Sequence, residues 1–394
     1  MIPVAEARAR ILAPLSPLPT ETVPLARALG RVLAEPVAAR RTQPPFDASA
    51  MDGYAVRRAE AGPGAVLRVI GESAAGARFD GVLGAGQAVR IFTGAPLPAG
   101  ADDVLIQEDA DRNGDRITVR AGRDEKRHIR PAGDDFAAGD VFPGRGPLGP
   151  ADIALLAAMN HAALPLRRRP VVALIATGDE LVMPGAEPGP DQIVSSNNFG
   201  LAAMLTRAGA VPRLLPIAAD RPESLAALLE LASDADLIVT LGGASVGDHD
   251  LVRATALAQG LELGFYKVAM RPGKPLMAGT LRGTTLIGLP GNPVSAMVCG
   301  AIFVLPAVRT MLGLPPGPET RAARLAGPVG RNGPREHYMR ARLEETADGP
   351  RVTVFERQDS ALLHVLQAAD CLAVRPADAP AAAAGDLVQV VPLP

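Results

Sequence analysis

Tryptophan is absent from this 394-residue sequence, and aromatic residues of all kinds make up only 3% of it. A sequence so poor in aromatic residues offers little on which exposed nucleic-acid bases could stack. The formal net charge of −2 also lacks the excess of lysine and arginine that binding to a phosphate backbone requires. Both observations argue against a nucleic-acid partner.

Cysteine is nearly as scarce, because the sequence contains only Cys299 and Cys371. Two cysteines build neither a disulfide framework nor a cysteine-rich zinc site, so we interpret both as buried thiols. The first ten residues carry several charges and are not followed by the apolar stretch of a signal peptide. The longest apolar region, 294–305, is short for a membrane span. We therefore expect a cytoplasmic protein without a membrane partner.

The chain is longer than one ordinary domain, which spans roughly 100–200 residues. Its hydrophobic content of 48% and charged content of 21% are typical of globular domains. Four parts with different residue patterns follow one another, and together they predict a multidomain protein of the α/β and β classes. We expect an extended, helical N-terminal domain at 1–46 and 136–169, an inserted β domain at 47–135, an α/β domain at 170–316 and a C-terminal, barrel-like β domain at 317–394.

The first 160 residues change from a helical to an alternating pattern and back. Residues 41–55 between the first two patterns are expected to form a loop. Asn113-Gly114 is a strong hairpin signal, so the alternating region is expected to be a small β-barrel or sandwich. The expected helices are 4–12, 25–33 and 152–159, and the expected strands are 66–70, 87–92, 104–107 and 117–120.

Residues 170–316 alternate between strand and helix patterns, which predicts a parallel sheet with helices on both faces. Ligands of such sheets bind outside the carboxyl ends of the strands. The proline-rich segment 315–318 is expected to be a stiff linker to further strands. The expected strands are 171–176, 211–217, 237–241, 265–270 and 285–289, then 338–343, 351–355, 371–374 and 387–391; the expected helices are 198–208, 222–231, 251–258 and 293–312.

Two strands of the α/β region end in glycine-rich turns. The strand at 237–241 is followed by the turn 242–250, and the strand at 285–289 by the turn 290–295. A strand that ends in glycines before a helix allows backbone N–H groups to converge on an anion. The turns read Gly242-Gly243-Ala244-Ser245-Val246-Gly247-Asp248-His249-Asp250 and Pro290-Gly291-Asn292-Pro293-Val294-Ser295.

Carboxylates follow three strands of the same sheet. The first strand ends in Thr177-Gly178-Asp179-Glu180, which alone is also explained by the preference of a helix N-terminus for acidic residues. Acids at several strand ends repel one another unless a cation or donor compensates, and Mg²⁺ prefers carboxylates, water and phosphates. The expected metal ligands are Glu180, Asp220, Asp248 and Asp250, with His249 interpreted as a spacer between two acids.

Positive charge is concentrated at Lys267, Arg271 and Lys274. The intervening Pro272-Gly273 makes a stiff turn that could aim two of these cations at an oxyanion at little entropic cost. A solvated basic turn would also explain them. Ser245 either donates to the same anion or caps the helix that follows.

The polar loop around Asp52 has no obvious role in folding. The simplest explanation is that the Asp52 carboxylate accepts hydrogen bonds from backbone N–H groups of the turn. With the features above, this loop completes six motifs in order that resemble the MoeA family, molybdopterin molybdenumtransferase, which is similar to the C-terminal domain of gephyrin. The motifs are Ser49-Ala50-Met51-Asp52-Gly53-Tyr54-Ala55, Thr93-Gly94-Ala95, Thr177-Gly178-Asp179-Glu180-Leu181, Gly242 to Asp248, Pro272-Gly273-Lys274-Pro275 and Leu289-Pro290-Gly291-Asn292-Pro293-Val294-Ser295.

The resemblance implies a homodimer of four-part subunits. Its α/β domain would bind molybdopterin, and its cleft would lie between the α/β domain of one subunit and the N- and C-terminal domains of the other. The family uses Mg²⁺ to hydrolyse adenylylated molybdopterin, inserts molybdenum from molybdate and releases AMP. A molybdopterin adenylyltransferase and apo-molybdoenzymes are the implied protein partners.

The resemblance also assigns roles to residues. The catalytic positions implied are Asp52, Thr93, Asp135, Glu180, Asp220, Asp250, Lys267, Arg271 and Lys274; the binding positions are Thr177, Gly178, Gly242, Gly243, Ser245, Gly247, Pro290, Asn292, Arg340 and Ser360.

Several positions depart from the family pattern. Ser195 replaces an aspartate, Asp134 replaces a glutamate, Arg271 stands where lysine is common, and the expected Gly-Ser-His around Ser360 reads Asp359-Ser360-Ala361. These changes leave open a paralogue with an altered oxyanion or pterin substrate. A non-catalytic dimeric scaffold and a molybdopterin adenylyltransferase are two further hypotheses for the same fold.

Overall fold

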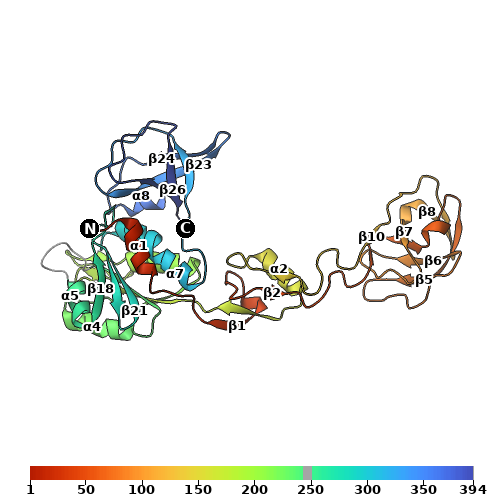
Figure 1. Cartoon of the computed structure of the whole chain (residues 1–394), viewed down its shortest axis with the longest axis horizontal. Coiled ribbons are helices and arrows are strands. Elements are labelled where there is room, and N and C mark those ends of the chain that lie inside the picture. The colour runs from red at the N-terminus through yellow and green to blue at the C-terminus, as the bar shows by residue number, and fades with distance from the viewer. Residues whose placement is uncertain (243–250, 394) are drawn as a thin grey trace. The chain divides into compact units, whose positions relative to one another are not determined.

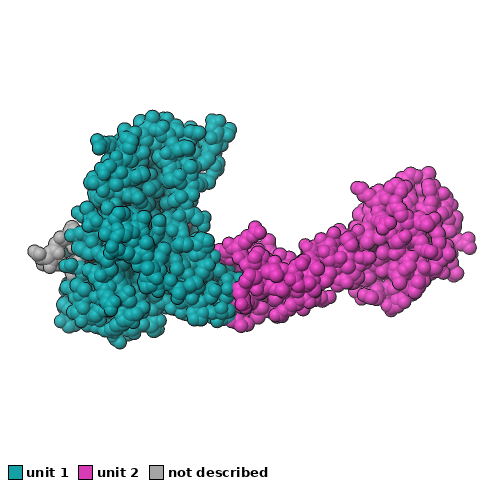
Figure 2. All heavy atoms as spheres, in the orientation of Figure 1, with its two compact units in different colours: residues 1–21, 30–34, 166–394 teal, residues 22–29, 35–165 magenta. Residues whose placement is uncertain are grey.

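The computed structural model describes residues 1–242 and 251–393, and the chain forms two compact units. Figure 1 traces the elements, and Figure 2 colours the units. Unit 1 consists of Met1–Glu21, Gly30–Ala34 and Leu166–Pro394, and unit 2 of Thr22–Leu29 and Glu35–Pro165.

The inserted β domain of unit 2 is built on a six-stranded sheet with the order β7-β4-β6-β5-β9-β8. The four predicted strands are present, and β8 and β9 form the hairpin that Asn113-Gly114 predicted, with Gly114 and Asp115 as the connecting residues. The segment 41–55 is not wholly a loop: Tyr54 and Ala55 in β4 are buried in separate clusters. The strands are β4 (Gly53–Val56), β5 (Val66–Ser73), β6 (Gln87–Ile91), β7 (Asp103–Ile106), β8 (Ala110–Asn113) and β9 (Arg116–Val119).

The remainder of unit 2 contains short elements around one predicted helix, α2 (Pro150–Ala158). The predicted helix at 25–33 is wrong, because only Leu25–Arg27 forms a 3₁₀ turn and Gly30 takes a φ of 71°. The other elements are β2 (Val37–Ala38), β3 (Ala48–Ser49), η2 (Arg58–Glu60), η3 (Gln107–Asp109), β10 (Ile129–Arg130) and β11 (Val141–Phe142); β1 (Thr20–Pro24) and β12 (Ala163–Arg167) are two more short strands.

The central sheet of unit 1 has the order β16-β13-β17-β21-β20-β18. The first four strands are parallel as predicted, but β20 pairs antiparallel with both of its neighbours, β21 and β18. Arg282 and Gly283, both with positive φ, connect β20 to β21 as a two-residue hairpin, which reverses the chain. The strands are β13 (Val171–Ala176), β16 (Val211–Leu214), β17 (Leu237–Leu241), β18 (Leu261–Tyr266), β20 (Met277–Leu281) and β21 (Thr284–Leu289).

Two predicted strands end elsewhere. The strand expected at 265–270 is wrong in its bounds, because Lys267 has a φ of 73° and ends β18, and the chain resumes as β19 (Met270–Arg271). The strand expected at 211–217 stops at Leu214, before Pro216, which has no N–H to donate.

Helices cover both faces of this sheet, as predicted. Val172 and Leu174 of β13 face one core, and Ala173 and Ile175 face the other, which explains why the strand reads as a continuous apolar run. The first core receives α1 (Val4–Leu12), α3 (Asn197–Arg207), α6 (Pro293–Cys299) and α7 (Leu305–Met311), and the second receives α4 (Pro222–Leu231) and α5 (Leu251–Ala258).

The predicted helix at 293–312 is a continuous helix from Pro293 to Met311 with a π-helical segment, Gly300–Val304. This helix of 19 residues is long and apolar enough to cross a membrane. The expectation from the sequence, an apolar region limited to 294–305, is therefore too short. The apolar window is 78% buried inside the protein, and the helix packs in the first core of unit 1. Its apolar character is therefore explained by folding.

The C-terminal part forms a closed barrel in the order β23-β24-β22-β26-β25, with β25 pairing back to β23. The short β19 adds to β23 in parallel and thereby attaches the cationic turn to the barrel. Cys371 in the barrel and Cys299 in α6 are both fully buried, as predicted. The barrel elements are β22 (Arg321–Leu325), β23 (Glu336–Thr346), β24 (Gly349–Val354), α8 (Leu363–Gln367), β25 (Cys371–Arg375) and β26 (Leu387–Pro392).

Candidate active site

The carboxyl ends of three parallel strands meet in unit 1. Thr177 after β13 donates its N–H to Leu241 O at 2.9 Å, and Gly242 after β17 donates to Leu289 O at 3.2 Å. Gly242 has a φ of 99°, and a Cβ there would lie only 2.6 Å from Thr177 O. The close approach of these turns therefore requires glycine at 242. The predicted phosphate-binding turns thus begin side by side.

Acidic side chains follow two neighbouring strands of the sheet, β13 and β16. Asp220 donates its N–H to Asp179 Oδ1 at 3.0 Å, and Asp179 donates back to Asp220 Oδ2 at 3.4 Å. The Glu180 carboxylate folds over Gly178, where an added Cβ would meet Glu180 Oε2 at 2.3 Å. The structure thus brings Glu180 and Asp220 to adjacent strand ends, as the sequence predicted.

Mg²⁺ commonly takes one or two protein carboxylates and fills its shell with water and substrate phosphates. Within residues 1–242 and 251–393, no cluster of three or more Asp, Glu, His or Cys side chains forms a ready-made cage. The exposed carboxylates of Asp179, Glu180 and Asp220 nevertheless fit Mg²⁺, because this ion needs only one or two protein carboxylates. Asp248 and Asp250, the other expected ligands, lie outside the described residues.

The three predicted cations surround one tight turn. Lys267 N–H donates to Leu276 O at 2.9 Å, and Val268 N–H donates to Lys274 O at 3.1 Å, so both ends of the turn are hydrogen-bonded. Gly273 has a φ of 106°, and a Cβ there would lie 2.4 Å from Cys299 Sγ. The turn therefore rests directly on helix α6, which fixes the backbone of Arg271 and Lys274.

Arg340 of β23 is the largest fully buried side chain of the protein's described part. Its Nη2 donates to Asp359 O at 3.1 Å and to Arg357 O at 3.3 Å, whereas Nε and Nη1 have no partner among the described residues. Burial lowers the pKa of Arg340, Asp359 opposes this, and Arg271 lowers the pKa further. A buried guanidinium with two idle donors is suited to an anion.

His337 lies beside this arginine pair and escaped the sequence analysis. It pairs in register with Arg271 through β19 and β23 and is buried. Burial lowers its pKa to about 4, and Arg271, Arg340 and Arg335 add to the effect. No sequence signal could have revealed it, because its proximity to Arg271 comes from strands 66 positions apart.

The turn after β21 is joined to the barrel loop that carries Ser360. Asn292 Nδ2 donates to Ser360 Oγ at 2.9 Å, and Val294 N–H donates to Ser360 O at 3.0 Å. Asn197 Nδ2 at the start of α3 donates to Gly291 O at 2.7 Å. Asn292 and Ser360 therefore belong to one hydrogen-bonded assembly within unit 1, and Pro290 lies in the same turn.

Asp52 and Thr93 form a second, separate arrangement in unit 2. Asp52 Oδ1 accepts from Thr93 N–H and from Thr93 Oγ1, both at 2.8 Å. These two bonds are the main reason that the pKa of Asp52 is lowered, with Arg90 contributing as well. Asp135 is exposed on another loop of unit 2, where its N–H donates to Gln43 O at 3.1 Å.

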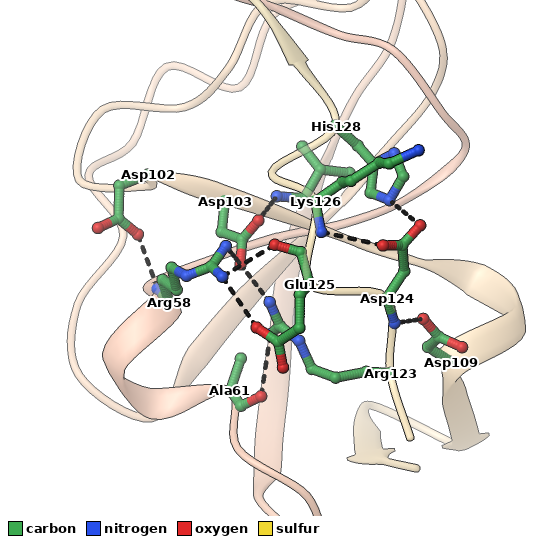
Figure 3. A network of polar contacts seen from close by, with 11 residues as sticks. Arg58, Ala61, Asp102, Asp103, Asp109, Arg123, Asp124, Glu125, Lys126 and His128 are labelled. Carbon is green, nitrogen blue, oxygen red and sulfur yellow. Dashed lines mark hydrogen bonds and ion pairs between the residues drawn. The ribbon is translucent and has the colours of Figure 1, made fainter. Parts of the chain in front are cut away.

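Residues 123–130, which we call the strap, hold the segment before Asp52. Figure 3 shows the polar contacts that anchor the strap itself. His128 O accepts the Ala50 N–H at 2.8 Å, and β10 of the strap pairs with β3. The strap is anchored by Arg123, whose Nη2 lies 2.5 Å from the buried Asp103 carboxylate. Arg58 Nη1 approaches the same carboxylate at 3.4 Å.

The structure therefore groups the predicted site residues into two sets. Unit 1 carries Thr177, Gly178, Glu180, Asp220, Gly242, Lys267, Arg271, Lys274, Pro290, Asn292, Arg340 and Ser360, and unit 2 carries Asp52, Thr93 and Asp135. Gly243, Ser245, Gly247, Asp248, His249 and Asp250 lie outside the described residues.

Three regions of the chain match known family regions in order. Residues 2–160 match the MoeA N-terminal region (domain I and II), residues 173–310 a probable molybdopterin binding domain, and residues 322–393 the MoeA C-terminal region (domain IV).

Full-length relatives agree with these regions. Molybdopterin molybdenumtransferase 2 of Mycobacterium tuberculosis (strain H37Rv) is 39% identical over 385 residues, covering 94% of either chain. Molybdopterin molybdenumtransferase of Staphylococcus aureus (strain MW2) is 32% identical over 99% of this chain and 95% of its own. The crystal structure of the molybdopterin biosynthesis MoeA protein from Pyrococcus horikosii covers 100% of this chain and 99% of its own, with a TM-score of 0.85 and 30% identity. The chain belongs to the MoeA family.

Proposed function

We propose that this protein is a molybdopterin molybdenumtransferase, a transferase of molybdenum cofactor biosynthesis. Its substrates are adenylylated molybdopterin and molybdate, and it releases AMP in a Mg²⁺-dependent reaction. Family membership along the whole chain supports the transferase activity. The cationic and acidic side chains of the two residue sets support the assignment of these substrates.

The observation that supports the proposal most directly is the buried guanidinium of Arg340, of which two nitrogens lack a hydrogen-bond partner among the described residues. A buried cation whose Nε and Nη1 find no partner in the described part of the chain is costly unless a ligand compensates it. Arg271 is near enough for its charge to lower the pKa of Arg340, and Ser360 follows the Asp359 carbonyl that Arg340 already binds. Molybdate, a tetrahedral dianion, offers oxygens to all three side chains, and Lys274 adds charge from the neighbouring turn.

The phosphate end of the substrate is assigned to the strand ends. The turns at Thr177 and Gly242 present backbone to the ligand, and the buried Thr177 Oγ1 also has no partner among the described residues. Asp179, Glu180 and Asp220 would hold Mg²⁺ there. When bound, this ion would neutralise phosphate charge and favour attack of water on the phosphoryl group.

Unit 2 contributes Asp52 and Thr93 to the proposed reaction. The paired hydrogen bonds from Thr93 keep Asp52 ionised and fix one carboxylate oxygen, so the other oxygen remains for the substrate or its metal. We propose a homodimer that acts in the cytoplasm, with the four-part division at 1–46 with 136–169, 47–135, 170–316 and 317–394.

The decisive experiment supplies purified protein with adenylylated molybdopterin, molybdate and Mg²⁺ and measures AMP by chromatography. AMP release that depends on both molybdate and Mg²⁺, with activation of an apo-molybdoenzyme, is expected. Ligand binding without AMP would instead support a non-catalytic scaffold. Light scattering at assay concentrations checks the homodimer.

A matched pair of variants tests the oxyanion assignment. Arg340→Met is expected to abolish the stabilisation by molybdate in a thermal unfolding assay, whereas Arg342→Met, at an exposed position of the same strand, should not. Tungstate in place of molybdate tests whether the oxyanion substrate is altered.

A further inference from the structure

Arg90 in β6 is held between two aromatic rings next to Asp52. Its guanidinium carbon lies 4.7 Å from the ring centre of Phe92 and 5.2 Å from that of Tyr54. Both distances are within the range of a cation–π contact. In a chain with so few aromatic residues, two rings pack on one half-buried arginine.

The same guanidinium bridges the two strands that flank Asp52. Arg90 Nη1 donates to Gly53 O at 3.2 Å, and Arg90 Nη2 donates to Gln107 Oε1 at 2.8 Å. Gln107 in turn donates its N–H to Asp52 O at 3.1 Å. These three hydrogen bonds connect Arg90 and Gln107 with the carbonyl groups of Gly53 and Asp52.

Arg90 also lies close to Thr93 along the chain, because the two residues are three positions apart at the end of β6. Phe92, the ring that it contacts most closely, immediately precedes Thr93. Arg90 is therefore in contact with the carbonyl of Gly53, the residue after Asp52, on one side and with Phe92, the residue before Thr93, on the other. Neither contact reaches the carboxylate itself.

We propose that Arg90 is the positioning residue of the Asp52–Thr93 pair: its guanidinium ties the carbonyl of Gly53, the residue after Asp52, to the side chain of Gln107, so that the free carboxylate oxygen of Asp52 keeps one direction. The proposal rests on the function proposed above for its catalytic meaning. Its positive charge also contributes to the lowered pKa of Asp52, after the two bonds from Thr93.

Lysine cannot replace arginine in this role. Its single ammonium group is a point donor, whereas the planar guanidinium donates in two directions while it stacks on two rings. Arg90→Lys therefore separates positioning from charge, because it retains the charge and loses the bridge. Arg90→Gln removes both, and Gln107→Leu removes only the second acceptor.

The experiment compares these variants in the full-length protein, with Arg68→Gln as the control. Arg68 lies in the neighbouring strand β5 and forms an exposed ion pair with Asp115. We expect Arg90→Gln and Arg90→Lys to lower kcat for AMP release by about tenfold to a hundredfold. KM for molybdate should stay within about twofold, because the oxyanion residues belong to unit 1. Gln107→Leu should act in the same direction with a smaller loss, and Arg68→Gln should match the wild type.

Crystal structures of the wild type and Arg90→Gln give a readout that does not depend on activity. We expect Asp52 Oδ1 to leave hydrogen-bond distance of Thr93 N or Oγ1 in the variant. If both bonds persist, or if Asp52 moves and kcat does not change, the positioning role is refuted. If the wild type releases no AMP, the proposed function fails, and the crystal structures still decide whether Arg90 positions Asp52. Full turnover by Arg90→Lys would show that charge alone suffices and would overturn the proposal.

Discussion

Asn292 and Ser360 join the two halves of unit 1 through a side-chain hydrogen bond of 2.9 Å. Asn292 follows the last parallel strand of the α/β sheet, and Ser360 lies in a loop of the C-terminal barrel. The backbone N–H of Val294 donates to the carbonyl of the same serine at 3.0 Å. The proposed phosphate-binding turn and the proposed oxyanion pocket are therefore in contact.

Ser360→Ala should weaken molybdate binding without unfolding the protein. The change removes one neutral donor to a dianion, and such hydrogen bonds contribute about 1.5–3 kcal/mol, or about a tenfold to a hundredfold change in affinity. The carbonyl of residue 360 continues to accept from Val294, so the loop should stay in place. Isothermal titration with molybdate measures the effect, and the exposed Ser233→Ala is the control. Equal affinity in both variants would exclude the serine from the pocket.

Gly273→Ala should disturb the cationic turn more than an ordinary glycine substitution does. The new Cβ would lie 2.4 Å from Cys299 Sγ, in a backbone conformation with a φ of 106°. We expect a loss of about 3 kcal/mol, the sum of overpacking and left-handed strain. Urea unfolding measures the stability, and molybdate titration measures the displacement of Arg271 and Lys274.

Two comparisons isolate the clash at Gly273. Gly283 has a φ of 87° but no atom within 4 Å of an added Cβ, so Gly283→Ala should cost only about 1–2 kcal/mol. In a Cys299→Ala background, the additional cost of Gly273→Ala should fall, because the clashing sulfur is gone. Identical costs with and without Cys299 would show that the turn does not rest on the helix as described.

His337 should make the stability of the protein depend on pH below neutrality. Burial, with Arg271, Arg340 and Arg335, lowers its pKa to about 4 in the folded chain from an ordinary value of 6.5. The unfolded chain therefore binds the proton more readily, so stability is lost as the pH falls from about 6.5 to about 4. The shift corresponds to at most about 3 kcal/mol.

Urea unfolding between pH 4 and 7 measures this loss. His337→Gln should flatten the profile in that window, whereas the exposed His364→Gln should leave it steep. A profile unchanged by His337→Gln would assign the acid sensitivity to other groups.

Arg123→Met should destabilise the β domain of unit 2. Among the described residues, the substitution leaves the fully buried Asp103 carboxylate with Arg58 at 3.4 Å and the N–H of Val104 at 3.0 Å as its remaining partners. Breaking a buried ion pair in this way costs about 3–5 kcal/mol. Arg120→Met breaks an exposed pair with Asp111 and should cost at most about 1 kcal/mol. Thermal unfolding compares the two, and equal midpoints would contradict a role of Arg123 as the anchor of the strap.

Local sequence patterns predicted most of the elements because their causes are local. Helices α1, α4 and α5 match their predicted bounds, since apolar spacing and flanking prolines act within one or two turns. The predictions failed where the backbone leaves an ordinary conformation. Lys267 and Gly30 adopt positive φ and end a strand and a helical pattern that apolar spacing alone would have continued.

The sequence by itself determined the family, through six ordered motifs, and the charge signs of the site, because these are properties of residue type and order. Only the tertiary structure decided that His337 pairs with Arg271, that Arg340 is buried with two nitrogens lacking partners among the described residues, and that Arg90 connects Gly53 with Gln107 next to Asp52. The reason is that burial and strand pairing depend on strands from distant parts of the chain. A local sequence pattern therefore does not show which charged side chains become buried.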